Sequence, residues 1–161
     1  MNYKAHMKIS EYIKRPEFGV PVEVIDKIQV YHAHPMSYVR HLLGSPIWVS
    51  LNSGFRHEKH ELEKGRTKLT TEHLFRDTGR PGSENGLGAA DYRTRLDMMG
   101  KMINLIERHT DYSRLCYYPN VNTPFAHCDY RFGNTKLAFY ISKGGSWTQL
   151  SKDKLIEAVK M

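Results

Sequence analysis

Two short segments constrain how this chain can fold: residues 88–91, which read Gly-Ala-Ala-Asp, and residues 125–129, which read Phe-Ala-His-Cys-Asp. We predict that both are strands, and side chains alternate between the two faces of a strand. His127 and Asp129 then share one face, while the small residues between and before them turn toward the core. The two alanines before Asp91 allow neighbouring backbones to approach closely. The pattern predicts a sheet with a polar site on one face and a packed core on the other.

The remaining segments alternate between helical and extended patterns. A helix is expected to open at Pro21 and to be interrupted at Pro35, and a second helical segment over 36–43 is expected to end at Gly44. The helix that follows Thr94 is expected to be capped by Thr94 and Asp97 and to have a core stripe of Leu96, Met99, Ile103 and Ile106, and a C-terminal helix over 151–161 is expected to be capped by Ser151. The expected strands span 47–51, 88–93, 114–118, 125–132 and 137–142. Helices followed by mostly antiparallel strands indicate an α+β fold, with a small sheet flanked by helices.

The length of 161 residues fits a single domain. Residues 1–20 are expected to form an N-terminal arm with a short helical turn. Residues 57–87 are polar and rich in glycine and charge, and they are the least regular stretch of the chain. A polar loop of this length inside a compact domain is usually functional, so we expect it to border an active site.

The formal net charge is +7, but the lysines and arginines are spread along the chain. No basic helix and no basic, aromatic ribbon is present, which argues against nucleic-acid binding. No apolar run is long enough for a membrane span, and residues 1–6 lack the apolar core of a secretory signal. A basic surface remains compatible with a polyanionic partner such as a cell wall.

The two cysteines, Cys116 and Cys128, fall in strands that we expect to be neighbours. A disulfide between them is conceivable. Two buried thiols are the preferred interpretation, because free cysteine is among the most buried residue types.

The candidate metal chemistry lies in three residues. His73, Asp91 and His127 supply two imidazoles and one carboxylate, which are suitable ligands for zinc and leave a fourth position for water or substrate. His57 and His60 are rival ligands, but their spacing is one residue short of the His-Glu-x-x-His pattern. We therefore expect those two to lie on a solvated helix or turn.

The order of these motifs resembles the zinc D-alanyl-D-alanine carboxypeptidases and the related phage L-alanyl-D-glutamate endopeptidases, which share a fold with the hedgehog signalling domain. The resembling motifs, in chain order over about residues 20–142, are Ser-Gly-Phe-Arg at 53–56, His73, Gly-Ala-Ala-Asp at 88–91, Tyr-Tyr-Pro-Asn at 117–120 and Phe-Ala-His-Cys-Asp at 125–129. The resemblance implies a zinc ion held by His73, Asp91 and His127. It also implies that Arg56 binds a substrate carboxylate or carbonyl oxygen, and that Asp129 orients a ligand or handles a proton.

The chain departs from the family pattern at two points. His73 and Asp91 are separated by 18 residues, whereas the family spacing is much shorter, so an inserted loop is expected between them. Many members carry a glutamate three residues before the last histidine, and Pro124 occupies that position here. We favour Asp129 as the base or ligand-orienting group. There are three alternatives: Glu72 is the base, a residue from the 74–87 loop reaches into the site, or catalysis is weak or absent.

The resemblance implies a zinc-dependent peptidase that cleaves peptidoglycan stem peptides or cross-links. Such a phage product would be made in the cytoplasm and would act at the bacterial cell wall after release, or as part of a virion with other virion proteins. One alternative is a non-catalytic virion structural or wall-binding module that retains the fold. Another is a zinc hydrolase acting on an amide outside the wall.

Overall fold

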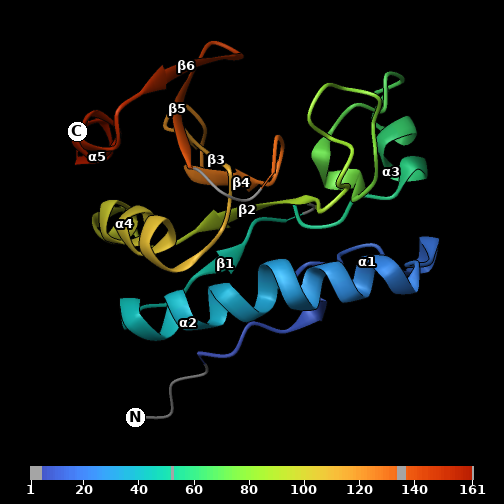
Figure 1. Cartoon of the computed structure of the whole chain (residues 1–161), viewed down its shortest axis with the longest axis horizontal. Helices are drawn as coiled ribbons and strands as arrows, with labels where there is room; N and C mark the ends of the chain where they lie inside the picture. The colour runs from blue at the N-terminus through green and yellow to red at the C-terminus, as the bar shows by residue number, and fades with distance from the viewer. Residues whose placement is uncertain (1–4, 52, 134–136, 161) are drawn as a thin grey trace.

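Strand β4 (Phe125–Asp129) lies between β2 (Ala89–Arg93) and β3 (Arg114–Tyr118) in the computed structural model, which describes residues 5–51, 53–133 and 137–160. Outer strands β1 (Trp48–Val49), β5 (Ala138–Lys143) and β6 (Ser146–Leu150) complete a six-stranded sheet in the order β1-β2-β4-β3-β5-β6. Neighbouring strands are antiparallel except β3 and β5, which are parallel. The chain is thus α+β with a mixed sheet flanked by helices, as Figure 1 shows.

The helices surround this sheet. Their bounds are α1 (Val22–Lys27), η3 (Ile28–Ala33), α2 (His34–Leu43), α3 (Glu58–Glu63), α4 (Met99–His109) and α5 (Lys152–Lys160), with shorter turns η1 (Ile9–Glu11), η2 (Pro16–Phe18), η4 (Glu72–Leu74) and η5 (Leu96–Met98). Within the described residues, none of them combines the length and apolar character that crossing a membrane would require. The expected helical turn of the N-terminal arm is η1, and residues 1–4 of that arm lie outside the described residues.

The expected interruption at Pro35 is wrong. Helical structure continues from α1 to α2 through η3, a π-helical segment, and Figure 1 shows one continuous rod. Pro35 lies in the first turn of α2, inside this continuous helical stretch, and it has no N–H to donate to the preceding turn. The carbonyl of Tyr31, four residues earlier, instead accepts a hydrogen bond of 2.5 Å from the Tyr130 hydroxyl. The predicted end at Gly44 is confirmed, with a left-handed φ of 65°.

The expected cap of α4 by Thr94 and Asp97 is also wrong. The Thr94 hydroxyl donates to the Pro46 carbonyl at 2.7 Å, and Asp97 pairs with Arg95 at 2.8 Å. Leu96 is 59% exposed because it lies in η5, before the helix begins. The other members of the expected stripe are buried: Met99, Ile103 and Ile106.

Other expectations hold in part. Strand β6 was not expected; it follows the Gly144–Gly145 turn and forms a hairpin with β5. Ser151 caps α5 as predicted, because its hydroxyl accepts from the Lys154 amide at 3.3 Å. The stretch 57–87 contains only α3 and η4 as regular elements.

The two faces of the sheet have different roles. One face contributes Ala90, Tyr92, Leu115, Ala126 and Cys128 to the hydrophobic core, together with buried side chains of α2 and α4. Both cysteines are buried free thiols, as the preferred interpretation predicts. The opposite face carries the polar residues of β2, β3 and β4, and the core fixes their positions from behind.

His32 is a fully buried imidazole in this core. Its Nε2 donates to the Leu87 carbonyl and its Nδ1 accepts from the Tyr112 hydroxyl, both at 2.8 Å. Aromatic rings surround it: Tyr12, Phe75, Tyr112 and Tyr130. Burial lowers the pKa of His32 from 6.5 to about 4, against the opposing effect of the Leu87 hydrogen bond.

We expect His32 to make the fold sensitive to acid. The unfolded chain protonates this imidazole below about pH 6.5, whereas the folded chain resists protonation down to about pH 4. Stability present above pH 6.5 is therefore lost as the pH falls, by about 2 kcal/mol near pH 5. Urea unfolding of wild type and His32→Gln at pH 7.5 and pH 5 measures this. Equal pH dependence in both proteins would contradict the assignment.

Candidate active site

The register of β2 and β4 places two candidate ligands side by side. Asp91 pairs directly with His127 across the antiparallel ladder. Opposite residues of such a pair project from the same face at short separation. His127 Nδ1 lies 2.8 Å from Asp91 Oδ1, and both side chains are almost completely buried.

His73 joins this pair from η4. The Thr71 side chain caps η4 by accepting from the His73 amide, and the His73 carbonyl accepts from the Arg56 amide at 2.9 Å. His73 Nδ1 lies 2.8 Å from the Gly54 carbonyl oxygen. A carbonyl only accepts, so Nδ1 carries the proton and Nε2 is free to act as a ligand. That Nε2 is 3.4 Å from Asp91 Oδ1.

The structure therefore brings together the three candidate ligands selected from the sequence, including His73 across its 18-residue separation from Asp91. One donor atom from each of His73, Asp91 and His127 lies within 4.8 Å of the other two. Two imidazoles and one carboxylate at this spacing are able to hold a divalent transition metal such as zinc.

Asp129 lies behind His127. Its Oδ2 is 2.9 Å from His127 Nε2, and Arg114 donates to both of its carboxylate oxygens, at 2.9 and 2.5 Å. The Arg131 amide donates to Asp129 Oδ1 at 3.0 Å, and the Asp129 side chain is fully buried. Burial alone would raise the pKa of Asp129, but His127 and Arg114 hold it well below its ordinary value. Asp129 is an ionised acceptor that fixes the ring of His127.

Burial and neighbouring charges shift the pKa values of the three clustered residues. Burial opposes protonation of His127, but hydrogen bonds to Asp129 and Asp91 raise its pKa to about 9. Burial also acts against ionisation of Asp91, yet His73 and His127 hold its pKa well below the ordinary range. For His73, desolvation dominates and lowers the pKa. A metal cation bound to His127 Nδ1 would take the place of the proton on that nitrogen, which faces Asp91.

Arg56 lies beside Asp91. Its guanidinium nitrogens are 3.7 Å from Asp91 Oδ2 and 3.6 Å from Glu61 Oε1. Glu61 is buried and also pairs with Arg66 at 3.0 Å. Arg56 is thus held between two carboxylates at the edge of the cluster.

The cluster opens into a cavity of about 560 Å³. Its polar lining includes Arg56, Glu72, Arg80 and Arg114, and its aromatic lining consists of Tyr118, Phe125 and Trp147. Glu72 is only 5% exposed, and its Oε1 has no hydrogen-bond partner among the described residues. Burial, followed by repulsion from Asp129, raises its pKa above the ordinary value.

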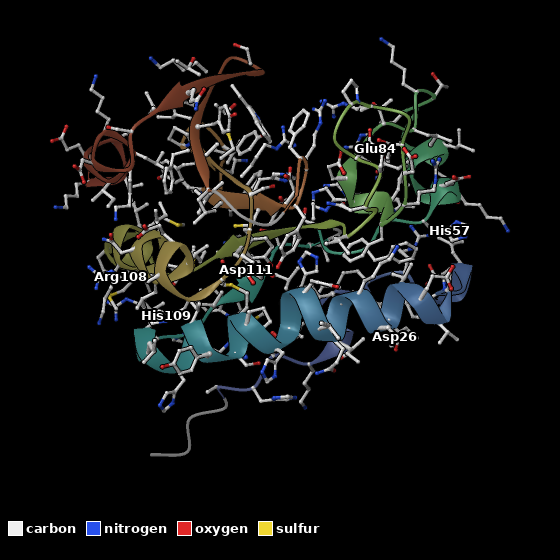
Figure 2. All side chains as sticks on the ribbon, in the orientation of Figure 1. Asp26, His57, Glu84, Arg108, His109 and Asp111 are labelled. Atoms are coloured by element: carbon white, nitrogen blue, oxygen red, sulfur yellow. The ribbon has the colours of Figure 1, made fainter. Side chains whose placement is uncertain are left out.

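The rival histidines lie elsewhere. His57 caps α3 by accepting from the Lys59 amide, and buried His60 follows within the same helix. Among the described residues, neither belongs to a group of His, Cys, Asp or Glu close enough to hold a metal. Figure 2 shows His57 beside α3 and His109 at the end of α4, at opposite ends of the molecule.

No protein-family model, curated protein or solved structure matches this chain. The family resemblance consequently rests on the sequence motifs alone. Three residues of the cavity were not singled out in the sequence: Arg80, Arg114 and Trp147. Only Arg114 had an available signal, because it faces Asp129 once β3 and β4 are paired in register.

Proposed function

We propose that this protein is a zinc-dependent peptidase that hydrolyses peptidoglycan stem peptides or cross-links. The observation that carries the proposal is the buried group of His73, Asp91 and His127, which opens into a cavity shared with Arg56. Each imidazole has its second nitrogen held by an acceptor, Gly54 for His73 and Asp129 for His127. Such contacts orient histidine ligands in zinc sites.

His73 would bind zinc through Nε2, His127 through Nδ1 and Asp91 through its carboxylate. Bound zinc lowers the pKa of a coordinated water toward neutrality and polarises an amide carbonyl. Arg56 supplies a planar, permanently charged donor for the oxygen that becomes negative during attack. Its pairing with Asp91 and Glu61 keeps the guanidinium at the edge of the cluster.

Two carboxylates divide the remaining tasks. Asp129 orients His127, since its oxygens are occupied by Arg114, His127 and the Arg131 amide. Glu72 takes the proton from the attacking water, because it lines the cavity and its Oε1 has no partner among the described residues. This assignment compensates for Pro124, which cannot accept a proton.

The proposed partner is a peptidoglycan peptide, and the net charge of +7 favours residence on an anionic wall. We further propose that the protein is phage-related and reaches the wall after release from the cell or within a virion.

The experiment is incubation of purified protein with peptidoglycan, with added zinc or with chelator, followed by labelling of new amine termini. We expect zinc-dependent release of amines. No release in the presence of zinc, together with retained wall binding, would instead support the non-catalytic module.

Glu72→Gln is expected to lower kcat by at least about a hundredfold, the usual contribution of a general base. Zinc stoichiometry should remain unchanged, because Glu72 is not among the three proposed ligands. Single-turnover hydrolysis and metal analysis of the same preparation measure both quantities. Glu84→Gln, on the exposed loop labelled in Figure 2, is the matched control. Wild-type kcat in Glu72→Gln would remove Glu72 from the mechanism.

A further inference from the structure

We infer that Arg80 is a specificity residue that binds a carboxylate group of the substrate, so that the protein selects acidic peptides. The inference rests on the proposed function. It adds a second point at which the substrate is held, beside the metal group, which is the set of His73, Asp91 and His127. Arg80 lies in the segment between His73 and Asp91 and lines the same cavity as both.

The first reason is that the charge of Arg80 is not neutralised by an ion pair. Three arginines line the cavity: Arg56, Arg80 and Arg114. Arg114 forms a paired contact with Asp129, and Arg56 lies between Asp91 and Glu61. Arg80 has no ion pair among the described residues; its Nη1 donates to the Thr70 carbonyl at 3.2 Å. A guanidinium has five N–H donors in a fork that matches a carboxylate, so donors remain for a ligand.

The second reason is that the segment carrying Arg80 is fixed in place. The Ser83 hydroxyl donates to the Arg80 carbonyl at 2.7 Å. In the two residues that follow Arg80, the Pro81 carbonyl accepts from Arg131 Nε at 2.7 Å, and the Gly82 carbonyl accepts from the Phe132 amide at 2.8 Å. These bonds tie residues 80–83 to the chain that leaves β4. A charge held in this way binds with less loss of conformational freedom than a mobile surface side chain.

The third reason is that Arg80 acts within the electrostatic reach of the reaction site. It lines the same cavity as Glu72 and the three proposed ligands. The cavity also offers an apolar wall in which Tyr118 and Phe125 stack at 4.5 Å and Trp147 donates to the Tyr118 hydroxyl. A peptide with a short apolar portion and a carboxylate fits this combination of linings.

The test uses binding and hydrolysis of one peptide in three forms. The probe is L-Ala-γ-D-Glu-L-Lys-D-Ala-D-Ala, unmodified, amidated at the glutamyl α-carboxyl, or amidated at the C-terminus. Binding to the zinc-loaded protein is followed by tryptophan fluorescence, because Trp147 lines the cavity. The variants are Arg80→Met, Arg80→Lys and the control Arg76→Met, whose residue belongs to the same loop and pairs with Glu58.

We expect amidation of one carboxylate to weaken binding to wild type about 10- to 100-fold, the usual loss for a charge-assisted hydrogen-bonded pair. Arg80→Met should bind the acidic and amidated forms equally, Arg80→Lys should recover part of the preference, and Arg76→Met should behave as wild type. Indifference of wild type to both amidations, or an unchanged preference in Arg80→Met, would overturn the inference. Absence of hydrolysis alongside an Arg80-dependent preference in binding would refute the peptidase proposal and leave the inference standing.

Discussion

His127→Ala is expected to reduce zinc affinity by more than about a hundredfold and to abolish zinc-dependent peptidase activity. The substitution removes one of three clustered donors and also detaches the contact to Asp129 that orients the ring. Loss of the orienting contact alone typically costs 10- to 100-fold in metal affinity. Zinc per protein after dialysis, measured by elemental analysis, gives the result directly.

His127→Gln guards against loss of folding, because glutamine keeps hydrogen-bonding capacity between Asp91 and Asp129 but is a poor zinc ligand. His57→Asn is the matched control, since asparagine preserves the helix cap that His57 provides to α3. We expect full zinc content in His57→Asn and none in either His127 variant. Stoichiometric zinc in a folded His127 variant would refute the ligand set.

Gly54→Ala is expected to destabilise the fold by about 3 kcal/mol, in the range seen for severe overpacking. An added Cβ at residue 54 would lie 2.3 Å from the backbone oxygen of Tyr12, and a backbone atom cannot move aside as a side-chain tip can. That oxygen accepts from the Phe55 amide at 2.8 Å, so this bond would also be disturbed. The melting temperature should fall by roughly 10 °C, as measured by circular dichroism.

The effect should extend to the metal group, because the Gly54 carbonyl fixes the ring of His73. Zinc affinity should therefore fall about 10- to 100-fold in Gly54→Ala. Gly100→Ala, within α4, is the control: its Cβ would meet the Ile156 side chain of α5 at an ordinary 3.5 Å. Alanine there should stabilise the helix by about 0.5–1 kcal/mol. Equal stability of the two variants would contradict the proposed close approach.

Strand alternation explains why much of the sheet could be predicted from the sequence. Residues 127–129 read polar, small, polar, so a strand places His127 and Cys128 on opposite faces. The structure has Cys128 in the core and His127 in the lining of the cavity. The direct pairing of Asp91 with His127 is a finding of the structure, because alternation alone does not determine which residues of two strands are opposite each other. Local pattern was sufficient for the assignment of faces, because one face of the sheet is buried.

Contacts between distant segments could not be predicted in the same way. Pro35 does not break its helix, because a hydroxyl from Tyr130, far along the chain, bonds to the Tyr31 carbonyl. Thr94 does not cap α4, because its hydroxyl bonds to Pro46. The lining of the cavity by Arg80 depends on how an irregular segment is tied to the end of β4. None of these contacts has a periodicity that a sequence displays.

The alternation of β4 also limits how such a protein can diverge. Each residue of β4 faces either the core or the side of the sheet that carries the cavity, so inserting one residue would exchange the two sets and lose stability and chemistry together. The segment between His73 and Asp91 is under no such constraint, because its length can change while both ends stay anchored. New specificity should therefore arise at the exposed residues of this segment, and libraries that vary those residues should yield altered peptide preference at little cost in folding. Gly82, Ser83 and Gly86 should be kept, because the two glycines leave no room for a Cβ and Ser83 is fully buried.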